Sequence, residues 1–276
     1  MSTPFGVRLR AAMDAYGALC VGIDPHDGLL DGWGLPHDVS GLARFSAVCV
    51  EALGGQVACV KPQSAFFERF GSAGVAVLER TLADLRAAGT LTILDVKRGD
   101  IGSTMAAYAV AYLGEASPLR ADAITVSPYL GYGSLRPALD LAAETGRGVF
   151  VLALTSNPEG ASVQHAVRGG RSVAGAVVDG VRADNAAARG VGRLGSVGLV
   201  VGATVGSAVT DLGLDLAAAN APLLAPGVGA QGAAAGDLEA VFGAALPNVL
   251  ASASREVLGA GPSVAALRAA AARCTL

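Results

Sequence analysis

The sequence predicts an α/β fold in which eight parallel strands close into a (β/α)8 TIM barrel, as a single domain over residues 1–276. Short apolar runs rich in β-branched residues recur along the chain, and Ala-rich stretches with helical spacing separate them. The runs are apolar throughout, which is typical of parallel strands buried on both faces. Eight such units in 276 residues favour a closed barrel over an open sheet, which usually has fewer strands.

Each predicted strand has the length of a buried strand, and most are followed by a stretch with helical periodicity. The strand candidates are Leu19–Asp24, Val57–Lys61, Leu91–Lys97, Ala123–Ser127, Val149–Thr155, Gly198–Ala203, Pro222–Ala225 and Asn248–Ser252. The helix candidates are Val75–Ala88, Met105–Leu113, Leu135–Glu144, Val173–Ala188 and Val264–Arg273, and a further helix is expected to begin near Gly236.

The alternative fold, an open doubly wound sheet, lacks its usual fingerprint in this sequence. Such a sheet carries G-x-G-x-x-G at its first strand–helix turn. The first predicted strand instead ends in Val21-Gly22-Ile23-Asp24-Pro25. No low-complexity linker divides the chain, so a one-domain barrel is the simpler prediction.

Composition excludes several classes of function. Hydrophobic residues make up 52% of the chain, charged residues 16%, and the net charge is −3. No run of Lys and Arg occurs, so we expect no nucleic-acid partner. No apolar stretch reaches the roughly 18–20 residues that span a bilayer, and the N-terminus lacks a secretory pattern, so we expect a cytoplasmic protein without a membrane partner. The four cysteines lack C-x-x-C spacing and the three histidines share no ligand spacing, so we expect no metal site.

Lysine is nearly absent from the chain. Of the 20 basic residues only Lys61 and Lys97 are lysines, and Arg fills every other cationic position. An exposed salt bridge can usually use either residue, but a site that needs an ammonium able to release its proton cannot use Arg, whose pKa stays above about 12. Both lysines are therefore candidate functional residues.

Polar residues follow the predicted strands at the barrel rim, where TIM-barrel active sites form. Asp95 and Lys97 are two apart on one strand, so their side chains should project from the same face. A structural ion-pair network is the alternative interpretation, but exposed pairs stabilise little and buried pairs are costly, so we favour a functional cluster. The rim candidates are Asp24, Lys61, Asp95, Lys97, Asp100, Ser127, Ser156 and Arg255.

Two turn segments at the rim could bind a ligand. Pro226-Gly227-Val228-Gly229-Ala230-Gln231-Gly232 follows the seventh strand, and the loops after strands seven and eight of such barrels commonly bind phosphate through backbone N–H groups. Arg255 could add a bidentate contact to the same dianion. The segment Thr155-Ser156-Asn157-Pro158-Glu159-Gly160 offers hydroxyl and amide groups that could recognise a polar ring.

These motifs together resemble those of the orotidine 5′-phosphate decarboxylase family. The run Asp95-Val96-Lys97-Arg98-Gly99-Asp100 matches its Asp-x-Lys-x-x-Asp signature, and the longer run through Thr104 is similar to the longer-chain bacterial branch. The ordered set of matches extends over nearly the whole chain and is highly specific. The supporting matches are Gly22-Ile23-Asp24-Pro25, Val60-Lys61-Pro62-Gln63, Thr155–Gly160, Pro226–Gly232 and Ala253-Ser254-Arg255.

The resemblance implies a cofactor-free homodimer with shared active sites that converts orotidine 5′-monophosphate to uridine 5′-monophosphate and carbon dioxide in pyrimidine biosynthesis. It implies that Lys97, beside Asp95, protonates the carbon left by the carboxylate. The other implied roles are ribose binding for Asp24 and Lys61, phosphate binding for Pro226, Gly229, Gln231 and Arg255, pyrimidine contact for Ser156, and donation of Asp100, Ile101 and Thr104 to the partner subunit's site.

Three other interpretations stay open at this point. A metal-assisted decarboxylase of a keto-sugar phosphate could share the Asp-x-Lys-x-x-Asp run, and it would need a divalent ion. A Schiff-base aldolase could use Lys61 or Lys97 as its nucleophile. A non-catalytic barrel could bind nucleotide monophosphates without turning them over.

Overall fold

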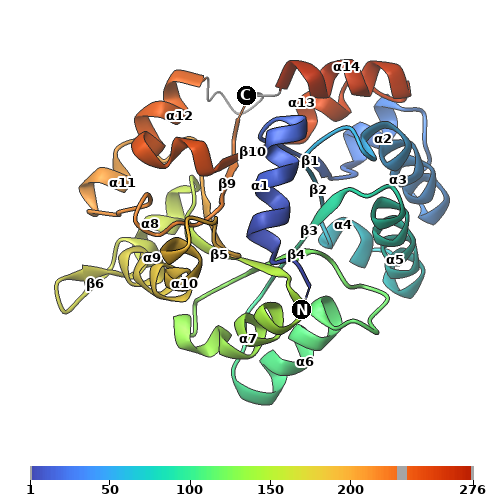
Figure 1. The fold of residues 1–276 in the computed structure, drawn as a ribbon. Helices are drawn as coiled ribbons and strands as arrows, with labels where there is room; N and C mark the ends of the chain where they lie inside the picture. Colours follow the sequence, from blue (N-terminus) through green and yellow to red (C-terminus); the bar gives the residue numbers. More distant parts are fainter. Residues whose placement is uncertain (1, 229–234, 275–276) are drawn as a thin grey trace.

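The computed structural model describes residues 2–228 and 235–274, and its strands form a closed parallel barrel, as the sequence predicted (Figure 1). The barrel order is β1-β10-β9-β8-β5-β4-β3-β2. The observed strands lie within a few residues of the predicted ones. Their bounds are β1 Leu19–Ile23, β2 Cys59–Pro62, β3 Leu91–Arg98, β4 Ala123–Val126, β5 Gly148–Leu154, β8 Val197–Val201, β9 Leu223–Pro226 and β10 Val249–Ala253.

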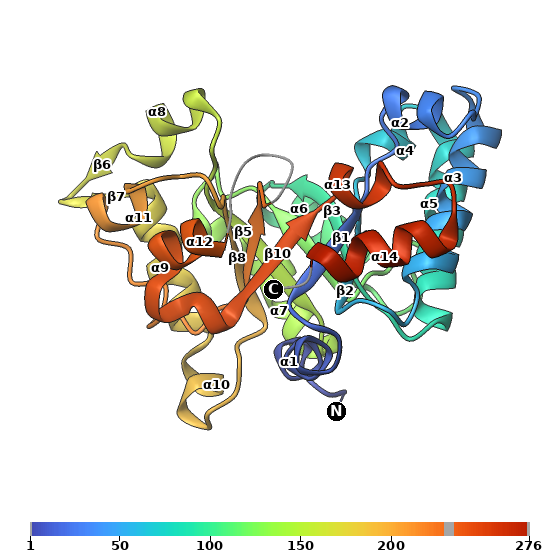
Figure 2. The ribbon, with the colours of Figure 1, turned by 90° about the horizontal axis from the view of Figure 1, so that it is seen from above.

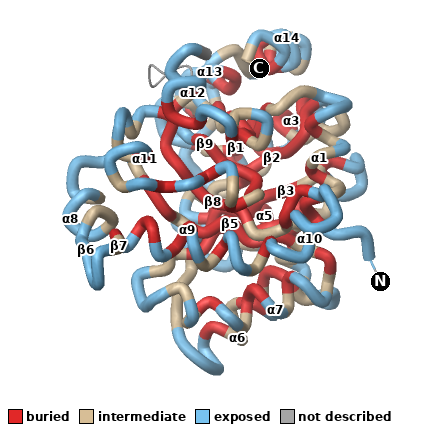
Figure 3. The backbone as a smooth tube through the Cα atoms, turned by 60° about the vertical axis from the view of Figure 1, so that its left-hand side comes forward, coloured by how far each residue is buried: buried red, intermediate tan, exposed pale blue. Residues whose placement is uncertain are grey.

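Helices cover the outside of the barrel, and their outward faces are exposed while the strands are buried (Figure 3). The sequence analysis did not predict the long helices α1 Phe5–Tyr16 and α3 Val39–Leu53, nor the short helices α2 Asp27–Gly32, α4 Ala65–Glu68, α8 Ala161–Gln164, α11 Ala208–Asp211 and α13 Arg255–Leu258. The other α-helices are α5 Gly71–Ala87, α6 Gly102–Leu113, α7 Arg136–Thr145, α9 Val173–Asp184, α10 Ala186–Gly190, α12 Ala235–Phe242 and α14 Val264–Cys274, with short 3-10 turns at Tyr132–Leu135, Pro158–Gly160 and Gly243–Asn248.

The predicted helix Val173–Ala188 is wrong as a single element, because the chain breaks it at Asn185 into α9 and α10. The Asn185 side chain is buried, donates to the Val197 carbonyl at 2.8 Å and accepts from the Val197 N–H at 3.2 Å. The Asn185 side chain thus bonds both backbone groups of Val197, the first residue of β8, and this holds the break between α9 and α10 in place. Asn also favours helix ends over helix interiors, because its side chain competes for backbone groups.

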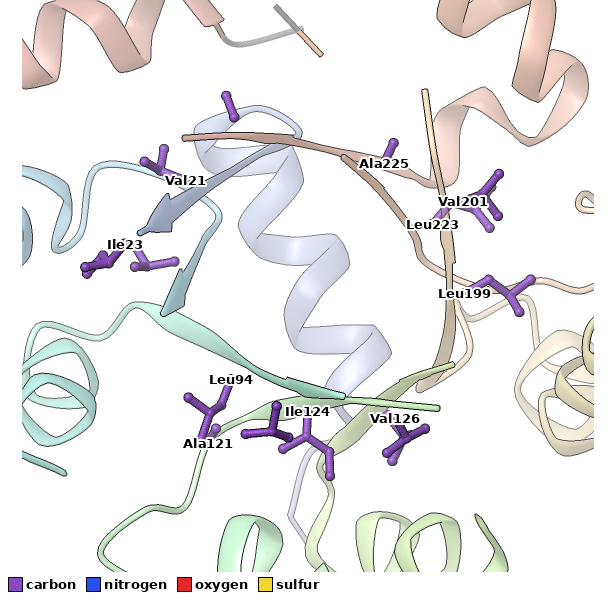
Figure 4. Packing of buried hydrophobic residues seen from close by; sticks show 14 of the residues in the cluster. Val21, Ile23, Leu94, Ala121, Ile124, Val126, Leu199, Val201, Leu223 and Ala225 are labelled. Carbon is purple, nitrogen blue, oxygen red and sulfur yellow. The ribbon is translucent and has the colours of Figure 1, made fainter. Parts of the chain in front are cut away.

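Successive strand residues face two different cores. Val21 and Ile23 of β1 point outward to the helices, as do Leu94 and Ile124 on neighbouring strands (Figure 4). The alternate residues, such as Cys20, point into the barrel. The two-sided burial explains why the strands are apolar throughout.

Helix α1 closes the N-terminal end of the barrel (Figure 2). Phe5, on α1, is fully buried and its ring lies 5.9 Å from that of Phe150 in an edge-to-face arrangement. Gly148 leaves room for this contact, because a Cβ atom there would lie 2.3 Å from the Phe5 ring. One end of the barrel is thereby filled by side chains, and the opposite end is left for a site.

The connection between β5 and α9 is larger than the sequence indicated. It contains α8 and an antiparallel hairpin of β6 Val167–Arg168 and β7 Arg171–Ser172, which projects beside the barrel (Figure 2). Across residues 2–228 and 235–274 no helix combines the length and apolarity needed to cross a bilayer. That residues 1–276 form a single domain stays a prediction.

Candidate active site

A cavity of about 430 Å³ lies at the C-terminal ends of the barrel strands, where the sequence predicted the site. Its volume is in the range of small-molecule binding sites. Leu152, Val200 and Leu224 form an apolar floor, which is continuous with the core inside the barrel. The polar lining residues are Asp24, His26, Lys61, Asp95, Lys97, Thr125, Thr155, Ser252, Ser254, Arg255 and Glu256.

Asp95 is the centre of a charged cluster in this cavity. Its carboxylate accepts hydrogen bonds from Lys61 Nζ at 2.8 Å and from Lys97 Nζ at 2.6 Å. The side chains of Lys61 and Asp95 are buried, whereas that of Lys97 is 44% exposed toward the cavity. Both lysines of the chain thus bind the same carboxylate and line the cavity, and the ammonium of Lys97 is the more exposed of the two.

The end of β3 bends to place Lys97. Its pairing with β4 is regular up to Leu94, opposite Ile124, and resumes at Arg98, opposite Val126, after a register shift. Within this bulge Lys97 has φ of 45°, in the left-handed region that a non-glycine residue rarely adopts. The predicted proximity of Asp95 and Lys97 is therefore confirmed, with a strained backbone that simple strand alternation does not require.

The charges in the cluster stabilise one another. Burial lowers the pKa of Lys61, but the Asp24 and Asp95 carboxylates outweigh it and hold that pKa above its usual value. Burial likewise raises the pKa of Asp95, and the two ammonium groups outweigh it and lower the pKa well below its ordinary range. Asp95 is ionised at neutral pH and can act only as an acceptor.

Asp24, which follows β1, extends the charged cluster beyond β2 and β3. Its Oδ1 lies 4.0 Å from Lys61 Nζ and is buried with no hydrogen-bond partner. A buried acceptor without a partner at a cavity wall is suited to a ligand hydroxyl group. Gly22 is needed beside it, because a Cβ atom at that position would lie 2.9 Å from Asp24 Oδ2 and 3.0 Å from Ser254 Cβ.

The wall formed at the ends of β9 and β10 combines a glycine turn and an arginine. Pro226 ends β9, Gly227 and Val228 follow it, and all three line the cavity together with Arg255. Gly227 has φ of 99°, so the chain turns here in a conformation that favours glycine. Gly229 and Gln231, the other predicted phosphate-binding residues of this loop, lie outside the described residues.

Five predicted residues do not line the cavity of their own chain. One is Ser127, whose backbone N–H donates to the Arg98 carbonyl at 2.8 Å. Asp100 accepts the Ile101 N–H at 2.8 Å through Oδ1 and makes no ion pair with Lys97 in this chain. Ile101 is 62% exposed and Thr104 is also exposed. Ser156 is exposed beside the cavity, and its neighbour Thr155 is the residue of that turn that lines the wall.

The structure also assigns residues to the cavity that the sequence analysis missed. Thr125 on β4 is the best placed, since its hydroxyl contacts Asp95 at 2.8 Å. A polar residue within the otherwise apolar run Ala123–Val126 was a signal that could have identified it. His26, Ser252 and Glu256 are the other charged or polar lining residues missed, and nothing in their local sequence marked them. Ser254 also lines the cavity, and it lies within the match Ala253-Ser254-Arg255, although no role was predicted for it.

Comparison with known proteins agrees with this geometry. The model of the orotidine 5′-phosphate decarboxylase / HUMPS family matches residues 17–270. The chain belongs to this family. It is 66% identical over 270 residues to a Salinispora arenicola protein named orotidine 5′-phosphate decarboxylase, with 98% of this chain and 95% of that protein covered. A protein of the same name from Streptomyces coelicolor is 63% identical over 272 residues, again covering 98% and 95%.

Solved structures show the same fold. A Streptomyces avermitilis homologue described as an orotidine 5′-phosphate decarboxylase superposes with a TM-score of 0.94 at 62% identity, and the match covers 99% of this chain and 94% of that one. The OMP decarboxylase of Leishmania donovani gives a TM-score of 0.71 at 31% identity, with 98% and 95% covered. The predicted family and the (β/α)8 barrel are thereby confirmed.

Proposed function

We propose that the chain decarboxylates orotidine 5′-monophosphate to uridine 5′-monophosphate and carbon dioxide, with Lys97 as the proton donor. The observation that carries this proposal is the Lys97 ammonium, presented to the cavity and held at 2.6 Å by the buried carboxylate of Asp95. The substrate follows from the names of the relatives that cover nearly the whole chain.

The ammonium supplies what the reaction needs. When the bond to the carboxylate breaks, its electron pair stays on a ring carbon that cannot delocalise it well. A preorganised cation aimed at that carbon stabilises the charge as it develops, and a proton then passes from Lys97 Nζ to the carbon. The lysine regains a proton from water after the product leaves.

The other cavity residues bind the rest of the nucleotide. Asp24 and Lys61 are proposed to hold the ribose hydroxyls. One of these hydroxyls would donate a hydrogen bond to Asp24 Oδ1, which has no partner in the structure. Arg255 is proposed to bind the phosphate in a bidentate manner, opposite the backbone of the Pro226–Val228 turn. Gly229 and Gln231 are proposed to add to the phosphate site, and Ser156 to contact the pyrimidine.

We further propose that two copies of the chain form a homodimer with shared sites. Asp100, Ile101 and Thr104 lie just after β3 but outside their own cavity. Ile101 is 62% exposed and Val110, on α6, is 60% exposed, while Tyr129 after β4 is 78% exposed. Large apolar side chains exposed around the catalytic strands are suited to burial against a second copy that receives Asp100.

Two lysine variants test the catalytic assignment. In an absorbance assay with orotidine 5′-monophosphate, Lys97→Ala and Lys97→Arg are both expected to reduce kcat by about 10⁴-fold or more, since they remove a general acid and, for Ala, a stabilising cation. Arg keeps the charge but cannot release a proton. Binding of uridine 5′-monophosphate should persist in both. A kcat within tenfold of the wild-type value in either variant would contradict the assignment.

Three measurements on the wild-type chain separate the alternatives. Turnover that a chelator abolishes and a divalent ion restores would indicate metal-assisted chemistry. Trapping of a substrate adduct by borohydride would indicate a Schiff base. Tight binding of uridine 5′-monophosphate by the wild-type chain, without release of carbon dioxide, would indicate a non-catalytic barrel.

Mixing two inactive variants tests the shared site. If Asp100 serves the partner's site, a mixed dimer of Lys97→Ala and Asp100→Ala has one intact site and one site with both defects. Subunits exchanged at equal concentration should then recover about a quarter of the wild-type activity, because half of the dimers are mixed. If each Asp100 serves its own chain, no intact site forms and the mixture stays inactive.

A further inference from the structure

Thr125 occupies the point where the bulge of β3 faces β4. Between the pairs Leu94–Ile124 and Arg98–Val126, β3 has three residues while β4 has only Thr125. Its neighbours Ile124 and Val126 face the outer core, so Thr125 faces the barrel interior, where it lines the cavity and is 1% exposed. The backbone hydrogen bonds of a regular ladder cannot form across this mismatch.

The Thr125 hydroxyl replaces part of that missing ladder. It accepts the backbone N–H of Lys97 at 2.9 Å, and it donates to Asp95 Oδ1 at 2.8 Å. The direction of the second bond is fixed, because the ionised Asp95 carboxylate can only accept. One hydroxyl therefore uses its acceptor and its donor on the two catalytic residues of the neighbouring strand.

Both contacts act on the position of the Lys97 ammonium. The first holds the backbone of Lys97 at φ of 45°, a conformation that persists only where surrounding contacts enforce it. The second fixes the Asp95 oxygen that also accepts Lys97 Nζ at 2.6 Å. Lys97 is 44% exposed and its side chain has four rotatable bonds, so its place depends on these two anchors.

We propose that Thr125 is a positioning residue for the decarboxylation: its hydroxyl holds the bulge and the Asp95 carboxylate that together aim the Lys97 ammonium at the reacting carbon. This inference rests on the proposed roles of Lys97 and Asp95. The hydroxyl itself does not touch the reacting atoms in this scheme. Loss of the hydroxyl should therefore slow the chemical step, where a small displacement of a charged group is costly. It should change nucleotide binding only slightly.

The test compares Thr125→Val with Thr125→Ser. Val keeps the branched shape but has no hydroxyl, so kcat should fall by about 10- to 100-fold, the range of a lost hydrogen bond to a charged group, while KM changes less than threefold. Ser keeps the hydroxyl and should restore kcat to within about threefold of the wild-type value. The split between kcat and KM, together with rescue by Ser, distinguishes positioning from a general loss of stability.

Thr92→Val is a matched control. Thr92 lies on β3 near the other end of the barrel, is 2% exposed, and its hydroxyl also pairs with a carboxylate, that of Asp122 at 3.2 Å. The same substitution there should lower the melting temperature but leave kcat within twofold. A loss of kcat in Thr92→Val equal to that in Thr125→Val would overturn the proposal, because stability alone would then explain both.

The proposal also stays testable if a Thr125 variant does not fold. If Thr125→Val does not fold, Thr125→Ala is measured in its place, and near-normal kcat in either folded variant overturns the proposal. If neither folds although Thr125→Ser does, the hydroxyl serves the fold and the proposal fails. Lys97→Ala is run in parallel to separate the two proposals. If it retains activity, the assignment of Lys97 fails and the positioning role of Thr125 fails with it. If Lys97→Ala is inactive but Thr125→Val has near-normal kcat, only the positioning role of Thr125 is overturned.

Discussion

Replacing Asp95 with Asn should lower the free energy of unfolding more than the same substitution at an exposed ion pair. The substitution keeps the shape of the side chain and removes the charge between Lys61 Nζ at 2.8 Å and Lys97 Nζ at 2.6 Å. Lys61 is 9% exposed in its side chain, so its ammonium would stay buried. Within residues 2–228 and 235–274, Asp24, 4.0 Å away, would be the one counter-charge left to it.

The size of the effect follows from the burial of each partner. Removing one partner of a buried ion pair costs about 3–5 kcal/mol, and we expect the lower end, about 3 kcal/mol, because the Asn oxygen can still accept one hydrogen bond. The contact with Lys97 adds little, because that side chain is 44% exposed and water screens it. A loss of this size lowers the melting temperature of a chain of this length by about 6–12 °C.

Urea unfolding at pH 7 measures the change, with Asp179→Asn as the control. Asp179 makes an ion pair with Arg171 at 2.8 Å, but the carboxylate is 52% exposed, so its loss should cost less than about 1 kcal/mol. If Asp95→Asn costs no more than Asp179→Asn, the cluster does not hold a buried charge and the reasoning is refuted.

The pH dependence has a definite sign. The folded-state pKa of Asp95 is lowered from its ordinary value of 3.8, so its contribution to the free energy of unfolding is complete above that value and is lost as pH falls through the folded-state pKa. The difference between wild type and Asp95→Asn should therefore be constant from about pH 5 to pH 8 and shrink below about pH 4. A difference that grows as the pH falls would contradict the lowered pKa.

Three further predictions concern other parts of the molecule. Arg255→Ala should raise KM for orotidine 5′-monophosphate by about tenfold or more, and an unchanged KM in steady-state assays would count against phosphate binding there. Tyr132→Phe should cost about 1–3 kcal/mol in urea unfolding, because the Tyr132 hydroxyl donates to the Asp184 carboxylate at 2.5 Å; no change would mean that this bond stabilises nothing. Gly148→Ala should cost about 1–3 kcal/mol, since the new Cβ would meet the Phe5 ring, and calorimetry showing an unchanged melting temperature would disprove the tight contact.

The sequence by itself determined the barrel, because parallel strands buried on both faces must be apolar throughout and their lengths are visible as runs. It also identified Lys61, Asp95 and Lys97, since lysine is confined to two positions and Asp95 and Lys97 are two residues apart on one strand. Helix α1 was missed because it fills the end of the barrel, a role that depends on the closed shape rather than on its own pattern.

Only the tertiary structure decided how the charged residues meet. The contact between Lys61 and Asp95 joins positions 34 residues apart, and it exists because β2 and β3 are neighbours in the barrel. The left-handed backbone of Lys97 donates its N–H to the Thr125 hydroxyl on the neighbouring strand, a contact that no local pattern encodes. Local sequence sets which residues are buried and where strands end, whereas the distances between charges arise from strand order and register, which belong to the whole chain.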